Sequence, residues 1–313
     1  MPEPVFERLA IIGCGLIGSS LARATRASGA AAAVVVYDSN VGARAQIEAL
    51  GFADVVAASA EAAVTGADLV IFATPVGVVG EAAAAVAAHF APGAVVSDVG
   101  SCKGSVAAAL AAACPPGVHA IPGHPIAGTE RSGPDAGFAE LFQNRWTILC
   151  PQADAHPQHA ADYAAAVARL TRFWEALGAQ VECMDARHHD LVLAVTSHLP
   201  HLIAYNIVGT AADLEEVTQA EVMKFSAGGF RDFTRIAASD PTMWRDVFLN
   251  NREAVLEILA RFNEDLQALA RAIRWGEGDR LFELFSRTRE IRRGVIALGQ
   301  ESAEPNFGRD RKV

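Results

Sequence analysis

The sequence of 313 residues lacks the cysteine spacing of a metal site or a disulfide scaffold. Its five cysteines are odd in number and scattered, with no Cys-x-x-Cys pair and no histidine at zinc-finger spacing. We therefore expect reduced, mostly buried thiols in a cytoplasmic protein, and no metal at the functional site. These residues are Cys14, Cys102, Cys114, Cys150 and Cys183.

The chain also lacks positive charge, because 26 Lys and Arg stand against 36 Asp and Glu, for a formal net charge of -10. Nucleic acids and anionic membranes attract clustered Lys and Arg, so this balance argues against both as partners. A small-molecule substrate is the better expectation.

Targeting and membrane segments are missing too. Residues 1–10 carry Glu3 and Glu7, and only a four-residue apolar segment begins at Leu9, so we expect no signal peptide. Outside glycine-containing segments we find no run of about 18 uncharged apolar residues, the length of a membrane span. Internal repeats and low-complexity linkers are also absent. The sequence predicts a soluble protein without a membrane partner.

The first half does contain a regular alternation of short apolar runs and alanine-rich helical segments. This alternation is typical of βαβ units, and it predicts an α/β domain with a doubly wound, mainly parallel sheet. A hydrophobic content of 51% can fill the cores of two domains. The expected strands are residues 9–12, 33–37, 69–73, 94–97 and 118–121, and the expected helices are 16–28, 41–50, 78–90 and 106–113.

Two later strand-like runs, 146–150 and 180–184, flank a helix expected over about 158–177. We expect both runs to extend the same sheet. The first domain is therefore predicted to cover residues 1–184.

No convincing strand follows, so residues 185–300 are predicted to form an all-helical domain and residues 301–313 a polar tail. Asp185 is a suitable N-cap for a helix that extends to about residue 211. Asp240, which a proline follows, is a suitable N-cap for a second helix that extends to about Ile273. At 1.5 Å per residue the second helix would be roughly 50 Å long, more than a small domain is wide. Part of its apolar stripe should therefore be buried against another subunit.

Glycines follow the first expected strand and open a helix in the pattern Gly-x-Gly-x-x-Gly. In such a motif Gly13 allows a tight turn, Gly15 admits a pyrophosphate and Gly18 lets helix and strand pack closely. The helix N-terminus, with Leu16 and Ile17 in its first turn, would then face the phosphate charge. The motif indicates a Rossmann-like dinucleotide site, although a purely structural turn uses the same residues.

Asp38 ends the second expected strand, twenty residues after the last glycine of the motif. A carboxylate there accepts hydrogen bonds from both adenosine ribose hydroxyls and repels a 2′-phosphate. Ser39 and Asn40 supply no arginine to reverse this preference, so we predict NAD as the cofactor. Thr74 and Pro75 follow the third strand at the edge where cofactors gather, although a helix cap is an equally good interpretation of Thr74.

A histidine between Gly123 and Pro125 is the best candidate for a catalytic base. It follows an apolar strand-like run, and the glycine and proline make its loop rigid, so the backbone should aim the His124 imidazole. Ser101, beyond another strand end, could contact nicotinamide or His124, or it could cap the helix beginning near Lys103. Lys103 could belong to the functional site, but a position on a solvated face of the helix is an equally good interpretation.

Two histidines in the predicted helical half flank a proline. Pro200 removes a backbone donor and clashes with the Thr196 carbonyl, so it should kink the helix. His198 and His201 lie three residues apart on one face. Their position at a kink favours substrate contact over packing.

Arg231 and Arg235 lie four residues apart on one helix face, and arginine suits bidentate carboxylate binding. An internal pair between Asp232 and Arg235 is the structural alternative. Residues 188–190, His-His-Asp, suggest a metal site but lack a third suitably spaced ligand, so a solvated helix start is the better interpretation.

These segments, in this order, closely resemble the prephenate and arogenate dehydrogenase family of tyrosine biosynthesis. The resemblance covers about residues 8–273 and rests on GCGLIGSS, ATP, DVGSCK, GHPIAGTE, SHLPH, GGFRDFTRIA and SDPTMW. It implies NAD(P)-dependent oxidative decarboxylation of a cyclohexadienyl substrate, on a Rossmann domain joined to an all-α C-terminal dimerisation domain. A homodimer is therefore expected.

The resemblance also implies roles for single residues. His124 corresponds to the histidine that accepts the proton of the ring C4 hydroxyl while hydride leaves that carbon for nicotinamide. Ser101 corresponds to a serine that orients this histidine and the cofactor, Arg235 to an arginine that holds a substrate carboxylate, and His201 to a second substrate contact. The further candidate substrate-binding residues are Thr129, Glu130, His198, Asp232 and Trp244.

Two other functions stay open. Another NAD-dependent hydroxyacid dehydrogenase or imine reductase of this architecture would carry a helical catalytic lysine in a GxxxK pattern, which is missing. A non-enzymatic NAD-sensing module would need neither His124 nor Arg235. The 40 or so residues after Ile273 read as helix and tail and leave no room for a regulatory or mutase domain. The sequence does not decide between prephenate and arogenate.

Overall fold

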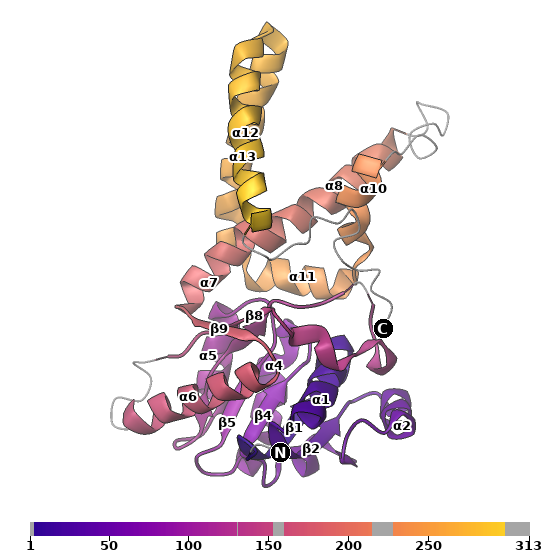
Figure 1. Cartoon of the computed structure of the whole chain (residues 1–313), viewed down its shortest axis with the longest axis vertical. Helices are drawn as coiled ribbons and strands as arrows, with labels where there is room; N and C mark the ends of the chain where they lie inside the picture. The colour runs from indigo at the N-terminus through magenta and orange to yellow at the C-terminus, as the bar shows by residue number, and fades with distance from the viewer. Residues whose placement is uncertain (1–2, 130, 153–159, 215–227, 298–313) are drawn as a thin grey trace. The chain divides into compact units, whose positions relative to one another are not determined.

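The structure is a computed structural model that describes residues 3–129, 131–152, 160–214 and 228–297 (Figure 1). By its internal contacts the chain divides into two compact units, Met1–Val255 and Leu256–Val313. Each unit is described by itself.

The first unit contains a six-stranded sheet in the order β3-β2-β1-β4-β5-β6, and every neighbouring pair is parallel. The order reverses between β1 and β4, where open α/β sheets bind their ligands beyond the carboxyl ends of the strands. The predicted doubly wound sheet is confirmed. Its strands are β1 (Phe6–Ile12), β2 (Ala31–Tyr37), β3 (Val55–Val56), β4 (Leu69–Phe72), β5 (Val95–Asp98) and β6 (His119–Ala120).

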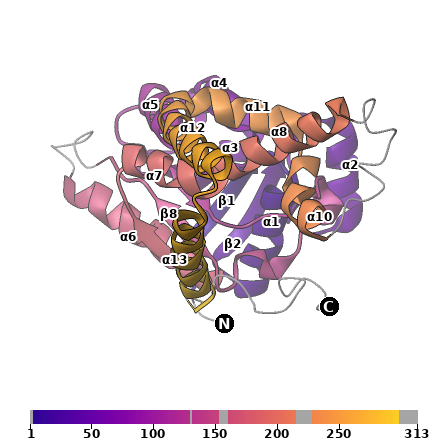
Figure 2. The ribbon, with the colours of Figure 1, turned by 90° about the horizontal axis from the view of Figure 1, so that it is seen from above.

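Helices cover both faces of this sheet, so its strands are apolar on both sides. In the view of Figure 2, α4 and α5 lie on one side of the strands, and α1 and α6 lie on the other. The helices of this part are α1 (Leu16–Ser28), α2 (Val41–Leu50), α3 (Ala60–Val64), α4 (Val79–Val86), α5 (Gly104–Ala113) and α6 (Ala160–Ala176).

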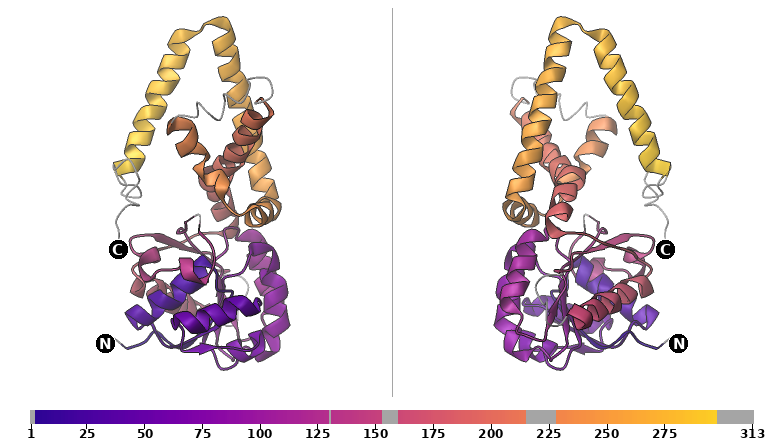
Figure 3. Two further views of the ribbon diagram at one scale, coloured as in Figure 1. Left: turned by 90° about the vertical axis from the view of Figure 1, so that its right-hand side faces the viewer. Right: turned by 90° about the vertical axis from the view of Figure 1, so that its left-hand side faces the viewer.

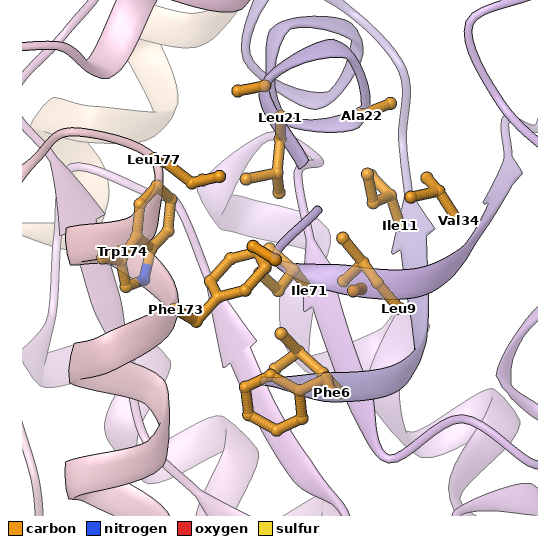
Figure 4. Close-up of a cluster of buried hydrophobic side chains, with 14 of the residues drawn as sticks. Phe6, Leu9, Ile11, Leu21, Ala22, Val34, Ile71, Phe173, Trp174 and Leu177 are labelled. Atoms are coloured by element: carbon orange, nitrogen blue, oxygen red, sulfur yellow. The ribbon is translucent and has the colours of Figure 1, made fainter. Parts of the chain in front are cut away.

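Aromatic side chains of α6 fill the core on the α1 side (Figure 4). Phe173 meets the ring of Phe6 edge to face at 5.8 Å between centroids, and Trp174 meets Phe142 in the same way at 5.4 Å. Neither Phe173 nor Trp174 is exposed. The contact between Phe173 and Phe6 anchors α6 to the first strand although 167 residues separate the two rings in sequence.

The two later strands form a separate sheet, so the expectation that they extend the first one is wrong. In the three-stranded sheet, β7 (Gly123–Pro125) pairs antiparallel with β8 (Trp146–Leu149), which pairs parallel with β9 (Gln180–Cys183). Pro122, which has no N–H group, follows the two-residue strand β6 and bonds through its carbonyl to Cys150 N at 2.8 Å. The chain thus leaves the large sheet, and His124 lies in a strand instead of at the crest of a loop.

The helical part of this unit begins where Asp185 caps α7 (Ala186–Leu193), as predicted. A π-helical turn, Ala194–His198, joins it to α8 (Leu199–Asp213). The kink expected from Pro200 takes this form, because a wider turn accommodates the proline ring and its missing N–H.

The stretch Ala186–Asp213 is long and apolar enough, by length and composition, to cross a membrane, which the sequence analysis did not anticipate. Core helices of soluble proteins meet the same criterion. This stretch carries the buried polar side chains of His189, Asp190 and His198, which belong to the site described below.

The second long helix expected from the sequence is broken. Asp240 caps α11 (Pro241–Asn250) as predicted, but the helical backbone is interrupted at Asn251 (φ -116°, ψ 34°) before α12 (Arg252–Trp275). The Asn251 side chain is bound to two groups of the preceding helices, which holds the break in place. A short helix α10 (Gly228–Thr234) and a 3₁₀ turn (Arg235–Ala238) precede α11.

The second unit is a helical hairpin. It contains α12 from Leu256 onward, a turn at Gly276 (φ 70°) and α13 (Gly278–Ala297). Figure 3 shows the two helices diverging from that turn. Many large apolar side chains of this hairpin are exposed. They are Leu256, Leu266, Ile273, Trp275, Phe282, Phe285, Ile291 and Val295.

Candidate active site

The glycine loop between β1 and α1 has the shape that a dinucleotide requires. Gly13 has φ 93°, and a Cβ atom there would lie 2.6 Å from the Ala73 carbonyl oxygen. A Cβ on Gly18 would overlap the Gly13 carbonyl oxygen, whereas one on Gly15 would meet nothing within 4 Å. No side chain caps the helix that starts with Leu16 and Ile17. The loop therefore fits a pyrophosphate at the N-terminus of α1.

Asp38 is held in a fixed orientation at the end of β2. Its Oδ2 accepts from Cys14 N at 2.9 Å, and its Oδ1 accepts from Asn40 N at 2.9 Å. Arg44, which was not among the residues predicted for this site, lies in the first turn of α2, and its Nη1 donates to the Asp38 carbonyl at 2.6 Å. The carboxylate remains placed for ribose hydroxyls, with a guanidinium beside it.

Thr74 lies at the carboxyl end of β4, next to the glycine loop. Its hydroxyl is buried and, among the residues that the structure describes, has no hydrogen-bond partner. Pro75 occupies the N-cap position of the following 3₁₀ turn, which has no side-chain cap, so Thr74 does not cap it. A buried hydroxyl without a partner at this edge is available to a bound cofactor.

A buried ion pair lies beneath the predicted base. Lys103 has no exposed surface, and its Nζ is 2.5 Å from Asp98 Oδ2 and 2.7 Å from the Gly123 carbonyl oxygen. The other Asp98 oxygen accepts from Gly123 N at 3.1 Å. The solvated-face interpretation of Lys103 is therefore wrong: Lys103 and Asp98 clamp the strand that carries His124.

His124 itself is buried and contacts a second histidine. Its Nδ1 is 2.9 Å from His189 Nε2, and His189 Nδ1 is 2.9 Å from Asp190 Oδ1. Asp190 in turn accepts from Lys103 N at 2.7 Å and from Gly104 N at 2.8 Å, which caps α5. The solvated-start interpretation of residues 188–190 holds only for the exposed His188.

The sequence contained a signal for this arrangement. Residues 186, 189, 190 and 193 are the buried ones of α7, and their spacing of three and four residues marks one helix face. A histidine and an aspartate on an otherwise apolar stripe are therefore candidates for a buried polar network.

Burial determines the charge state of the histidines. It lowers the pKa of His124 well below 6.5, and the nearby His189, Lys103 and His198 act in the same direction. Burial also lowers the pKa of His189, and that of His198 to about 4. These imidazoles are uncharged at neutral pH, so His124 is able to accept a proton.

The histidines flanking Pro200 lie against one tryptophan. The His201 ring stacks on Trp244 at 3.7 Å between centroids and 23° between planes, and His198 meets the same indole edge to face at 6.2 Å. His201 Nδ1 lies 2.8 Å from the Ser197 carbonyl oxygen, to which it donates. Burial lowers the pKa of His201; the hydrogen bond to the Ser197 carbonyl acts against this shift, and the charge of Arg235 adds to it.

Other predicted site residues are placed less tightly. Ser101 is half-buried between β5 and α5; within the described ranges it makes no hydrogen bond to His124, and Lys103 occupies the N-cap position of α5 in its place. Thr129 is exposed and accepts from Arg131 N. Asp232 is exposed, 4.0 Å from Arg231 Nε. Glu130 lies outside the described residues.

The described part of the chain contains no metal site. Within residues 3–129, 131–152, 160–214 and 228–297, no group of three or more His, Cys, Asp or Glu side chains is placed to hold an ion. Of the cysteines, Cys14, Cys102 and Cys150 are buried as expected, but Cys183 is exposed.

Comparison with known proteins adds independent findings. The family model described as prephenate dehydrogenase, nucleotide-binding domain, matches residues 21–183, and that described as prephenate dehydrogenase, dimerization domain, matches residues 185–287. A cyclohexadienyl dehydrogenase from Zymomonas mobilis is 44% identical over 288 residues, covering 92% of this chain and 96% of the relative. A prephenate dehydrogenase from Bacillus subtilis is 31% identical, covering 96% and 79%.

The fold is similar to that of a solved relative as well. The crystal structure of prephenate dehydrogenase from A. aeolicus, in complex with hydroxyphenyl propionate and NAD+, superposes with a TM-score of 0.84. Its sequence is 32% identical, and the match covers 92% of this chain and 98% of that one.

The ion pair between Lys103 and Asp98 gives a first prediction. Lys103→Met leaves the Asp98 carboxylate buried without its counter-ion, which should lower the free energy of unfolding by about 3 to 5 kcal/mol. Urea unfolding followed by circular dichroism measures this loss. Arg245→Met, which removes a 63% exposed partner of Asp246, is the control and should cost about 1 kcal/mol or less.

If Lys103→Met does not fold, adding Asp98→Asn should restore folding, because the double variant buries no charge. If the free energy of unfolding falls by the same small amount in Lys103→Met and in the control, Lys103 and Asp98 do not hold the strand that carries His124.

Proposed function

Because the chain belongs to the prephenate dehydrogenase family, we propose that His124 is its catalytic base and that the groups around it form its substrate site. The protein is an NAD-dependent oxidoreductase that decarboxylates prephenate or arogenate. This family membership sets aside the hydroxyacid dehydrogenase and the NAD-sensing module. The observation that supports the role of His124 is a buried, uncharged imidazole on the strand clamped to Asp98.

The sheet brings the proposed base and the cofactor loop to one edge. β5, which ends at Asp98, pairs with β4, which precedes Thr74; β4 pairs with β1, which ends at the glycine loop. Bound NAD supplies the hydride acceptor. We assign its binding to Gly13, Gly15 and Gly18, to the N–H groups of Leu16 and Ile17, and to Asp38, Thr74 and Pro75.

The proton follows a simple path in this proposal. His124 takes the proton of the ring C4 hydroxyl as hydride leaves that carbon, and the carbon becomes a carbonyl carbon. Loss of CO₂ then leaves the ring aromatic with a phenolate oxygen, which takes the proton back from His124. Atoms and charge balance without net uptake or release of a proton, and aromatisation makes the step effectively irreversible.

Arg235, His201 and Trp244 are proposed to bind the substrate on the helical side, with His198, Thr129, Glu130 and Asp232 as further candidate contacts. The charge of Arg235 acts on His201, which stacks on Trp244, and this supports a role for Arg235 in pairing with a substrate carboxylate. Ser101 is proposed to orient His124 once the cofactor is bound.

We further propose a boundary between a cofactor domain (1–184) and a helical domain (185–300), with a tail at 301–313. The helical domain would join two copies of this chain in a cytoplasmic homodimer. The exposed apolar side chains of the second unit support pairing with a second copy of this chain. The description of the matching family model as a dimerization domain supports it as well.

His124→Asn should lower kcat by about 10² to 10⁴, the contribution of a positioned general base, while NAD binding stays intact. In the unmodified enzyme, kcat/KM should stay level as the pH falls through 6.5 and decline only in more acidic solution, because a lowered pKa requires more acid for protonation. NADH absorbance with prephenate and with arogenate measures both. His89→Asn, at an exposed histidine, is the control. If kcat falls no further in His124→Asn than in this control, His124 is not the catalytic base.

Arg235→Ala should raise KM for substrate roughly tenfold to a hundredfold with a smaller change in kcat, because the substrate carboxylate loses a partner that is partly screened by solvent. Steady-state kinetics at saturating NAD give both constants. Arg231→Ala, one helical turn earlier and also exposed, should leave KM within about twofold. Equal KM values for the two variants would contradict the assignment.

The dimer is tested by placing charge on the hairpin. Phe282→Glu/Phe285→Glu introduces two carboxylates on one face of α13, and their burial at an interface should convert a dimer to monomers. Sedimentation velocity measures the mass. Asn263→Glu/Gln267→Glu adds the same charge at exposed polar positions of α12 and should remain dimeric. A monomeric unmodified protein at micromolar concentration would contradict the proposal.

A further inference from the structure

Three buried side chains form a continuous chain from the start of α5 to His124. Asp190 Oδ1 is 2.9 Å from His189 Nδ1, and His189 Nε2 is 2.9 Å from His124 Nδ1. His189 has no exposed surface, and the other two are nearly as deeply buried. Two of these three residues have no role in the reaction as outlined above.

Asp190 is the fixed end of this chain. Its Oδ1 accepts from Lys103 N and its Oδ2 from Gly104 N, so the carboxylate sits at the N-terminus of α5, where negative charge is stabilised. Burial alone would raise its pKa, but the hydrogen bonds from His189 and from the two backbone N–H groups lower the pKa below its usual value. Asp190 is therefore ionised and acts only as an acceptor.

An acceptor at this end determines where every proton lies. His189 must carry its proton on Nδ1 to donate to Asp190, and because burial keeps this ring neutral, its Nε2 is a bare acceptor. The 2.9 Å contact then requires His124 to donate from Nδ1. A neutral His124 protonated on Nδ1 has an unprotonated Nε2, the only nitrogen of the ring left for a substrate.

We propose that His189 and Asp190 are positioning residues that fix the tautomer and the ring orientation of His124, so that Nε2 is the atom that takes the substrate proton. This inference rests on the proposed role of His124 as the base. It adds that the base needs a specific partner on its far side.

The same chain also responds to the charge that forms during the reaction. When Nε2 takes up a proton, His124 becomes a cation that donates from Nδ1 to His189, which in turn donates to the Asp190 carboxylate. The negative charge at the far end stabilises the cation through two hydrogen bonds, and no proton has to leave the chain. The imidazolium exists only after proton transfer, so this stabilisation lowers the barrier more than the ground state.

A purely structural role would make different demands. Asp190 caps α5, and that cap needs no imidazole at position 189 and no particular tautomer of His124. Substitutions at His189 therefore separate the two roles, because they leave the cap in place.

The experiment compares three variants. His189→Leu removes the acceptor for His124 Nδ1, and kcat should fall by about 10² or more while KM for substrate and for NAD changes by less than about threefold. His189→Gln offers an amide oxygen near the position of Nε2 and should retain kcat within about tenfold of the unmodified enzyme. His188→Leu, at the exposed neighbouring histidine, is the matched control and should have no effect.

A second measurement needs no substrate. In the intact enzyme with ¹⁵N-labelled histidine, the His124 and His189 resonances, assigned from the spectra of His124→Asn and His189→Gln, should both show protonated Nδ1 and bare Nε2. A His124 protonated on Nε2, or a kcat for His189→Leu equal to that of the control, would overturn the proposal. If His189→Leu does not fold, the spectrum and the His189→Gln kinetics still decide. If His124→Asn is fully active while the spectrum shows the expected tautomers, the assignment of the base fails and the inferred tautomers stand.

Discussion

The carboxylate of Asp190 joins parts of the first unit that are far apart in sequence. It belongs to α7, yet it completes the N-terminus of α5, which follows the sheet strand β5, and it holds the imidazole that contacts His124. Its own backbone carbonyl accepts from the side chain of Asn251, the residue that follows α11. Because a buried charge is stable only when its hydrogen bonds are satisfied, this one group fixes the helical segments against the end of the sheet.

Around this carboxylate the protein buries several other polar groups. Lys103 and Asp98 neutralise each other, while the imidazoles stay neutral because burial lowers their pKa values. Such a network adds little to stability compared with an apolar core, since removing each group from water has a cost. Its value is specificity: the contacts behind His124 give this imidazole one orientation and one charge state before substrate arrives.

The sequence predicted well whatever depends on local patterns. Alternating apolar runs identified the parallel sheet, the glycine spacing predicted the tight turn found between β1 and α1, and the caps at Asp185 and Asp240 were correct. It failed where distant segments meet. The second sheet forms because β7 leaves the first one to pair with β8, and the helix from residue 241 breaks because Asn251 binds Asp190 and His198. Lys103 and His189 looked like surface residues for the same reason.

The fold class and the cofactor could therefore be predicted from the sequence, and His124 could be singled out as a candidate, because the motifs concerned lie in short stretches of the chain. The tertiary structure was needed to show that His124 is buried in a strand, that Lys103 and Asp98 form an ion pair beneath that strand and that His189 and Asp190 lie behind His124. The physical reason is that a pKa and a tautomer depend on burial and on partners, and the partners here come from segments that lie about 20 to 90 residues apart in the chain.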